Sequence, residues 1–222
     1  MPRAGSVMTE IELKFLLDEP AEKALRASPA LKRLTKGRQS RRKLLSIYYD
    51  TAGQDLRQAR IALRLRKVGQ GWVQTVKRGK GHGGAGLFSL QEEETEAPAG
   101  RLDLDLVQDE DLRKAIEAAC GGADLLPVFE TRMDRTTRIL ATDLGEAELA
   151  LDVGEVVAGN VAVAFREAEL ELKSGAPAVL YDIARELFSD IPVRFSERSK
   201  AARGYAAAAG EPALPEPGPV KA

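Results

Sequence analysis

The chain has 222 residues, 44% of them hydrophobic, which suffices for the core of one large domain and excludes a disordered protein. Lysine and arginine (33) nearly balance aspartate and glutamate (34), so the net charge indicates neither a nucleic-acid nor a membrane partner. No apolar run approaches the ~20 residues of a membrane helix, and none at the N-terminus resembles a signal peptide. We therefore expect a cytoplasmic protein.

Alternating apolar and polar residues predict β-strands through most of the chain, beginning with "TEIELKFLL" at 9–17. Further strands are expected at 43–53, 60–68, 71–79, 87–97, 127–142, 145–159 and 165–175. Helices are expected at 18–34, broken near Pro29, within 102–122, ending at Gly121, and at 176–190. Because strands and helices do not alternate regularly, an antiparallel sheet or barrel is favoured over a parallel one. Residues 209–222 are proline-rich and predict a linker or tail after a domain at 7–208.

One cysteine and one histidine limit the possible chemistry. Cys120 has no partner for an internal disulfide and stands near a predicted helix end, so we expect a small buried thiol in a reducing compartment. His82 cannot form a zinc site built on histidine pairs. It lies in the glycine-rich segment 78–86, which lacks the spacing of a Walker phosphate loop and is interpreted as a hairpin loop.

The polar faces of the strands carry charges sorted by sign. Like charges two residues apart share a face and repel, whereas an ordinary solvent face mixes signs. The sorted positions are Glu10, Glu12 and Lys14; Arg64 and Arg66; Glu92 and Glu94; Glu148 and Asp152; and Glu167, Glu169 and Glu171. The opposite faces are apolar and need the predicted helices as cover, which turns the charged faces inward. Buried unpaired charges are costly, so we expect a lumen that holds water, ions and a charged ligand.

The residue types in this lumen indicate the ligand. Carboxylates without histidine or cysteine suit hard cations such as Mg²⁺ or Mn²⁺. Lys14, Arg64, Arg66 and Lys77 supply donors that match phosphate oxygens, and Arg60, nearer the strand start, is expected to matter less. Together they predict a site for a metal-bound polyphosphate.

The chain resembles the CYTH superfamily, the triphosphate tunnel metalloenzymes. "EIELK" matches the ExExK signature, and "IYYDT", "LRLRK", "TVK", "ALDVGEV", "ELELK" and "SKAARGY" follow in order. Within the superfamily, the chain is most similar to the N-terminal domain of bacterial inorganic triphosphatases, in which a helical CHAD domain follows. The resemblance implies an α+β fold with an eight-stranded antiparallel barrel, an open tunnel and helices packed outside. It also implies Mg²⁺- or Mn²⁺-dependent hydrolysis of tripolyphosphate to diphosphate and phosphate, without a covalent enzyme intermediate.

The resemblance assigns roles to particular residues. Glu10, Glu12, Lys14 and Lys77 would be catalytic. The metal ligands would be Glu10, Glu12, Glu148, Asp152, Glu169 and Glu171, with Glu92 and Glu94 as further members. The triphosphate would bind Lys14, Arg64, Arg66, Lys77, Arg135 and Lys200, and Arg132 and Arg138 compete with Arg135 for the inward position. On the fifth strand, Leu90 or Ser89 stands where related sequences often carry a basic residue.

Three other interpretations stay open. The same tunnel could belong to a class IV adenylyl cyclase or to a thiamine or nucleoside triphosphatase, although no residue set for adenine and ribose is evident. It could bind long polyphosphate without cutting it, but binding alone would not require the metal carboxylates. A purely structural barrel would require the sorted charges to be solvated.

Overall fold

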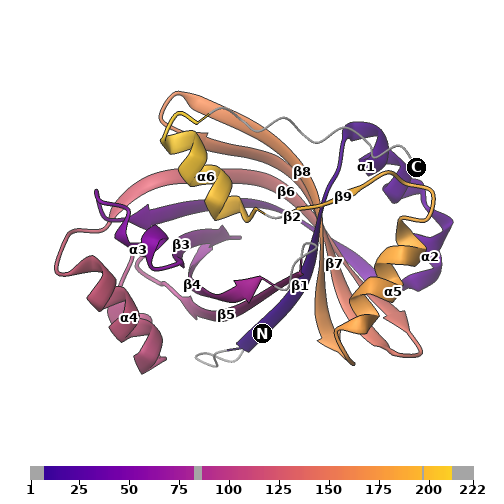
Figure 1. The fold of residues 1–222 in the computed structure, drawn as a ribbon, viewed down its shortest axis with the longest axis horizontal. Coiled ribbons are helices and arrows are strands. Elements are labelled where there is room, and N and C mark those ends of the chain that lie inside the picture. The colour runs from indigo at the N-terminus through magenta and orange to yellow at the C-terminus, as the bar shows by residue number, and fades with distance from the viewer. Residues whose placement is uncertain (1–7, 83–86, 197, 212–222) are drawn as a thin grey trace.

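The structure, a computed structural model, describes residues 8–82, 87–196 and 198–211 (Figure 1). The predicted tail at 209–222 lies outside these residues from 212 onward, as do positions 83–86 of the glycine-rich segment. The strands are β1 (Met8–Leu16), β2 (Thr35–Asp50), β3 (Ile61–Val68), β4 (Gly71–His82), β5 (Leu87–Glu96), β6 (Leu126–Thr142), β7 (Gly145–Ala158), β8 (Val161–Ser174) and β9 (Arg194–Phe195). The helices are α1 (Glu19–Ala27), α2 (Pro29–Leu34), α3 (Asp55–Gln58), α4 (Glu110–Cys120), α5 (Ala178–Leu187) and α6 (Lys200–Ala208), with a 3-10 turn at Leu104–Leu106.

Eight strands form a closed antiparallel barrel in the order β5-β4-β3-β2-β6-β7-β8-β1, and β1 closes it by pairing with β5. The short β9 adds to the end of β1. This arrangement confirms the predicted α+β barrel. The β3–β4 hairpin also has the expected turn, because Val68 pairs with Gly71.

Local sequence signals set the ends of several helices. The carboxylate of Asp18 accepts a hydrogen bond from the Ala21 N–H at the start of α1. Ser28 ends α1 and caps α2, which begins at Pro29, so the predicted break is confirmed. Helix α4 ends at Gly121, whose φ of 56° is the left-handed conformation expected of such a stop.

The apolar faces of the strands point outward beneath two groups of helices, as predicted. Helices α1, α2 and α5 cover one end of the barrel, where Leu13, Leu149 and Leu170 are buried, and α3 and α4 lie at the other end (Figure 1). None of the described helices is long and apolar enough to cross a membrane.

Four features differ from the sequence prediction. Strand β2 begins at Thr35, eight residues earlier than expected, and β4 continues to His82, so part of the glycine-rich segment is strand rather than loop. Cys120 is half-buried rather than buried, and it packs beside the α3–α4 core. Helices α3 and α6 were not predicted.

A further difference concerns the lumen, which is apolar over part of its wall. Phe129, Val156 and Phe165 lie an even number of residues from Arg135, Asp152 and Glu167, so they share the inward face of their strands. They form a core with Tyr205 of α6. Helix α6 thus packs on the inner face of β6, β7 and β8, and the charged ligand site is confined to the remaining space.

Candidate active site

A cavity of about 420 Å³ runs through the charged part of the barrel. It is lined by most of the residues that the sequence singled out. These are Glu10, Glu12, Lys14, Arg64, Arg66, Lys77, Arg135, Glu148, Glu169, Glu171 and Lys200. Asp152 lies just behind this wall, buried and bonded to Arg135.

The register of β6 settles which arginine points inward. Arg135 pairs across the sheet with Asp152 of β7 and forms hydrogen bonds of 2.7 and 2.6 Å to both carboxylate oxygens. Arg132 has a side chain that is 59% exposed, beside Glu130 and Glu155, and Arg138 bonds to Gln39 on the surface. Of the three competing arginines, Arg135 is thus the one whose side chain points into the barrel, which leaves its role in substrate binding a prediction.

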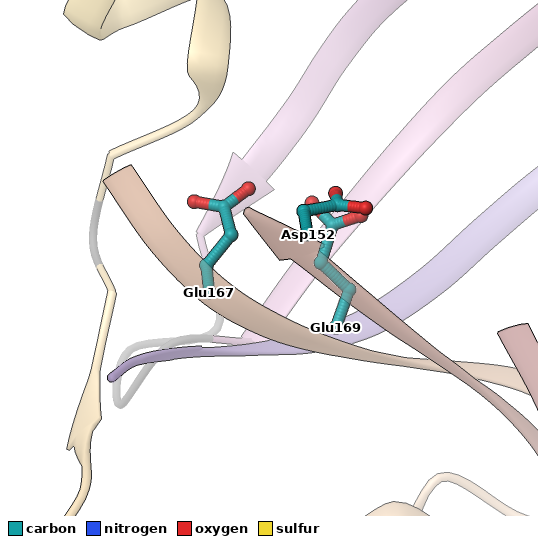
Figure 2. Close-up of side chains that lie close together, drawn as sticks. All are labelled: Asp152, Glu167 and Glu169. Carbon is teal, nitrogen blue, oxygen red and sulfur yellow. The ribbon is translucent and has the colours of Figure 1, made fainter. Parts of the chain in front are cut away.

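Three buried carboxylates meet near α6. Asp152 of β7 and Glu167 and Glu169 of β8 have oxygens within 4.8 Å of one another and rise from the same side of their strands (Figure 2). The Lys200 ammonium lies 2.7 Å from Asp152 and 2.9 Å from Glu169, and it also bonds Glu167. Arg203 adds a contact of 3.1 Å to Glu167.

These cations stabilise the ionised carboxylates. Burial opposes ionisation of Glu169, but Lys14, Lys200 and Arg135 outweigh it and hold the pKa of this carboxyl well below its ordinary value. Arg135 and Lys200 likewise outweigh burial and lower the pKa of Asp152. The cluster thus forms an internal salt-bridge network that joins α6 to the barrel.

A second acidic group, on β1, β7 and β8, is less completely neutralised. Glu12 pairs across the sheet with Glu171, and Glu171 pairs with Glu148. No described cation forms an ion pair with Glu148, whereas Glu171 pairs with Lys173 at 2.5 Å. The buried Oε1 of Glu12 lies near the Lys14 ammonium without forming a well-aligned hydrogen bond. Burial, together with Glu169 and Glu10, raises the pKa of Glu12 despite Lys14 at 3.0 Å. Carboxylate oxygens in this state fit a hard divalent cation.

Buried cations face this group across the cavity. Lys77 bonds Glu10 at 2.5 Å and Glu92 at 3.2 Å, and Arg64 lies 3.7 Å from both Glu92 and Glu94. Glu92 and Glu94 are therefore counterions of the basic wall. Arg66 has no carboxylate partner among the described residues and bonds only the Ser46 hydroxyl, at 3.0 Å.

Arg64 and Arg66 keep unused hydrogen-bond donors. Nε of Arg64 and one terminal nitrogen of Arg66 are buried without an acceptor. Burial, with Arg64 and Arg135 nearby, lowers the pKa of Arg66 to about 10. An anion bound between these two adjacent guanidinium groups would complete their hydrogen bonding.

A model of the CYTH domain matches residues 8–205. The chain belongs to this family. An inorganic triphosphatase of Haemophilus influenzae is 31% identical over 163 residues, which are 71% of this chain and 44% of that protein. The chain thus spans less than half the length of that relative.

Solved structures show the same fold. A proposed adenylyl cyclase from Hippeastrum, described as having a dominant triphosphatase activity, matches with a TM-score of 0.65 at 21% identity, over 93% of this chain and 98% of that one. A proposed adenylate cyclase from Bacillus halodurans matches with a TM-score of 0.60 at 18% identity, over 89% and 97%. At these identities the likeness concerns the CYTH fold alone.

The sequence did not assign a site role to several residues in or beside the cavity. Glu167 belongs to the like-charged run on β8, so its inward direction was predictable, but its lysine and arginine partners come from the unpredicted α6. Arg57, in the short α3, and Arg60, two residues after it, line the cavity at one end. Phe88 and Leu90 form an apolar part of the wall.

Proposed function

We propose that this CYTH domain hydrolyses inorganic tripolyphosphate to diphosphate and phosphate with the help of Mg²⁺ or Mn²⁺. The observation that carries the proposal is that one cavity contains buried guanidinium groups with unused donors and, opposite them, carboxylates with incomplete neutralisation. A bound anion would accept hydrogen bonds from the guanidinium groups, and a bound cation would neutralise the carboxylates. Triphosphatases among the relatives support this chemistry.

In this proposal the basic wall binds the substrate. Arg64 and Arg66 would donate their unused N–H groups to phosphate oxygens, and Lys14 and Lys77 would turn from their carboxylate partners toward the reacting phosphoryl group. Arg135 and Lys200 would mainly fix the carboxylate network and contribute positive potential. These groups would stabilise the charge that develops on the leaving diphosphate.

The proposed metal site consists of Glu10, Glu12, Glu148 and Glu171. Asp152 and Glu169 could join it only by giving up contacts with Arg135 or Lys200. A divalent cation would supply Lewis-acid polarisation of phosphate oxygens. The carboxylates themselves would set its position and leave the opposite wall free for phosphate.

A screen of phosphate release tests the proposal. Tripolyphosphate, ATP and thiamine triphosphate would each be incubated with Mg²⁺, Mn²⁺ or EDTA. We expect release from tripolyphosphate only with a divalent cation, and its near abolition in Glu10→Gln and Glu12→Gln. Glu110→Gln, on exposed α4, serves as the matched control. Turnover that survives exhaustive chelation would refute metal-assisted hydrolysis.

One observation favours a second candidate, an organic triphosphate substrate. Phe88 and Leu90 give the cavity an apolar wall that an inorganic ligand does not need. Preferential hydrolysis of thiamine triphosphate or ATP in the same screen would support this candidate. Binding without any turnover would instead favour a polyphosphate-binding module. The predicted CHAD partner domain stays a prediction.

A further inference from the structure

A pair of arginines lines the cavity where α3 and α6 lie at the same end of the barrel (Figure 1). Asp50, which is fully buried, fixes this end by accepting hydrogen bonds from the N–H groups of Leu56 and Arg57 and from the Tyr205 hydroxyl. Helix α3 is thereby tied to α6. The two exposed arginines, Arg57 and Arg60, therefore occupy a fixed rim rather than a free loop.

Arg60 has a backbone conformation that its side chain does not favour. Its φ is 58°, in the left-handed region where glycine has no steric penalty. The Arg60 N–H donates to the Arg57 carbonyl at 3.0 Å, and the Arg60 carbonyl accepts from Gly79 at 3.1 Å. The fold thus holds the residue in this conformation, and an arginine there is not explained by stability.

The two rim arginines differ in their contacts. Arg57 bonds Gln54 at 2.7 Å and lies over the Tyr205 ring at 5.2 Å. No ion pair or side-chain hydrogen bond joins Arg60 to another described residue. Deeper in the cavity, Arg64 and Lys77 each face a carboxylate. Arg60 is therefore a cation of the same cavity whose donors are free for a ligand.

The spacing along the chain indicates what that ligand is. The Cα atoms of Arg60 and Arg64 are four residues apart, about 13 Å along an extended chain. Arg60 precedes β3 and is not extended, but its Cβ lies 3.9 Å from the position of an added Cβ on Gly79, which shares the inward face of β4 with Lys77. Gly79, beside Arg60, leaves the passage open, since an added Cβ would come no closer than 3.9 Å to any atom. An anion centred on Arg64 and Arg66 therefore needs further phosphoryl groups to reach Arg60.

We propose that Arg60 is a binding residue for phosphoryl groups beyond the third, so that this CYTH domain takes linear polyphosphates of four or more units in preference to tripolyphosphate. The proposal deepens the proposed function and rests on its placement of phosphate at Arg64 and Arg66. Arg60 contributes a charge-assisted contact that tripolyphosphate is too short to make. Because the residue is exposed, this contact weakens as the salt concentration rises.

Calorimetric titration tests the proposal with tripolyphosphate and tetrapolyphosphate as ligands, in EDTA so that turnover does not interfere. For the wild-type chain we expect a dissociation constant about tenfold lower for tetrapolyphosphate, which corresponds to one charge-assisted contact. Arg60→Gln should reduce this preference to less than threefold, and Arg60→Lys should keep most of it. Arg185→Gln, on the outer helix α5, is the matched control and should retain the full preference.

The variant Arg60→Gly distinguishes the effect of the Arg60 charge on binding from the effect of its backbone conformation on stability. It should lose the preference as Arg60→Gln does, yet keep or raise the melting temperature, since glycine adopts the left-handed conformation without strain. An unchanged preference in Arg60→Gln would overturn the proposal, as would equal binding of both ligands by the wild-type chain. Either result would leave the proposed hydrolysis of tripolyphosphate untouched. An absence of turnover with Mg²⁺ and Mn²⁺ would refute the proposed hydrolysis but not the proposed preference for longer chains.

Discussion

The buried cations of the lumen are not equivalent. Arg66 is 9% exposed, lacks a carboxylate partner and has its pKa lowered by burial, Arg64 and Arg135, whereas Arg135 neutralises both Asp152 and Glu169. Replacing an unpaired buried charge by an apolar side chain is neutral or stabilising, whereas breaking a buried pair costs about 3–5 kcal/mol. Arg66→Met should therefore raise the free energy of unfolding by about 1 kcal/mol, and Arg135→Met should lower it by about 3 kcal/mol.

Urea unfolding without ligand measures both effects. Under the proposed function, Arg66→Met should also weaken tripolyphosphate binding at least tenfold, because a charge-assisted hydrogen bond contributes about 1.5–3 kcal/mol. Arg66 would then lower the stability of the fold while contributing to tripolyphosphate binding. A large loss of stability in Arg66→Met would show instead that its bond to Ser46 carries the fold.

The carboxylates near α6 predict a pH dependence. The folded pKa values of Asp152 and Glu169 lie below their ordinary values of 3.8 and 4.5. Their stabilisation is therefore present above these ordinary values and is lost as the pH falls through the lower folded values. The pKa of Glu12 is raised, so its contribution to the pH dependence of stability has the opposite sign. Protonation of Glu12 on acidification favours the folded state.

Comparing the wild-type chain with a variant that lacks the Asp152 carboxylate isolates the contribution of this network. The urea midpoint of the wild-type chain should exceed that of Asp152→Asn at pH 7, and the gap should narrow as the pH falls below about 4. Asp182→Asn, on the exposed face of α5, is the control. A gap that stays constant down to pH 3 would contradict the assignment of the lowered pKa values to this network.

Among the elements, α6 shows most clearly what the sequence could and could not predict. Strand faces were predictable because Glu10, Glu12 and Lys14 repeat every second residue, whereas the choice among Arg132, Arg135 and Arg138 needed the strand register that the structure shows. Helix α6 was missed because "KAARGYAAA" is short and has a glycine at its centre, so its stability comes from packing on Phe129 and Phe165. The ion pairs that Lys200 makes with Glu167 and Glu169 depend on this packing and could not be read from residue spacing.

A substitution at Gly204 tests the packing of α6 on the inner face of the barrel. An added Cβ would lie 2.0 Å from the Phe129 ring, so α6 must move or Phe129 must give way. In an isolated helix Gly204→Ala would gain about 1 kcal/mol, but overpacking costs about 1–3 kcal/mol. We expect thermal unfolding to show a net loss, and the loss should shrink in a background of Phe129→Leu. Stabilisation by Gly204→Ala alone would mean that α6 does not pack closely on the inner face.

At the scale of the molecule, the described residues form three apolar clusters that stabilise the fold, and the charged cavity lies among them. Two clusters lie under the outer helices, and the third joins α6 to the inner wall. None of these clusters involves the cavity's charged groups, and Arg64, Arg66 and Glu12 have buried polar atoms without hydrogen-bond partners. A ligand that satisfies these groups binds only the closed barrel and should stabilise it by mass action.

Ligand-dependent melting tests this coupling without an assay for turnover. Tripolyphosphate at 100 times its dissociation constant should add about 2.7 kcal/mol to the free energy of unfolding. For a chain of this size that corresponds to roughly 5–11 °C, and orthophosphate, which cannot contact Arg64, Arg66 and Lys77 together, should give much less. Lys77→Met should remove a large part of the shift, whereas Lys114→Met, on the outer helix α4, should keep it. Equal shifts of the melting temperature with tripolyphosphate and orthophosphate would contradict a binding site that extends along the lumen. They would indicate a site for a single phosphate group.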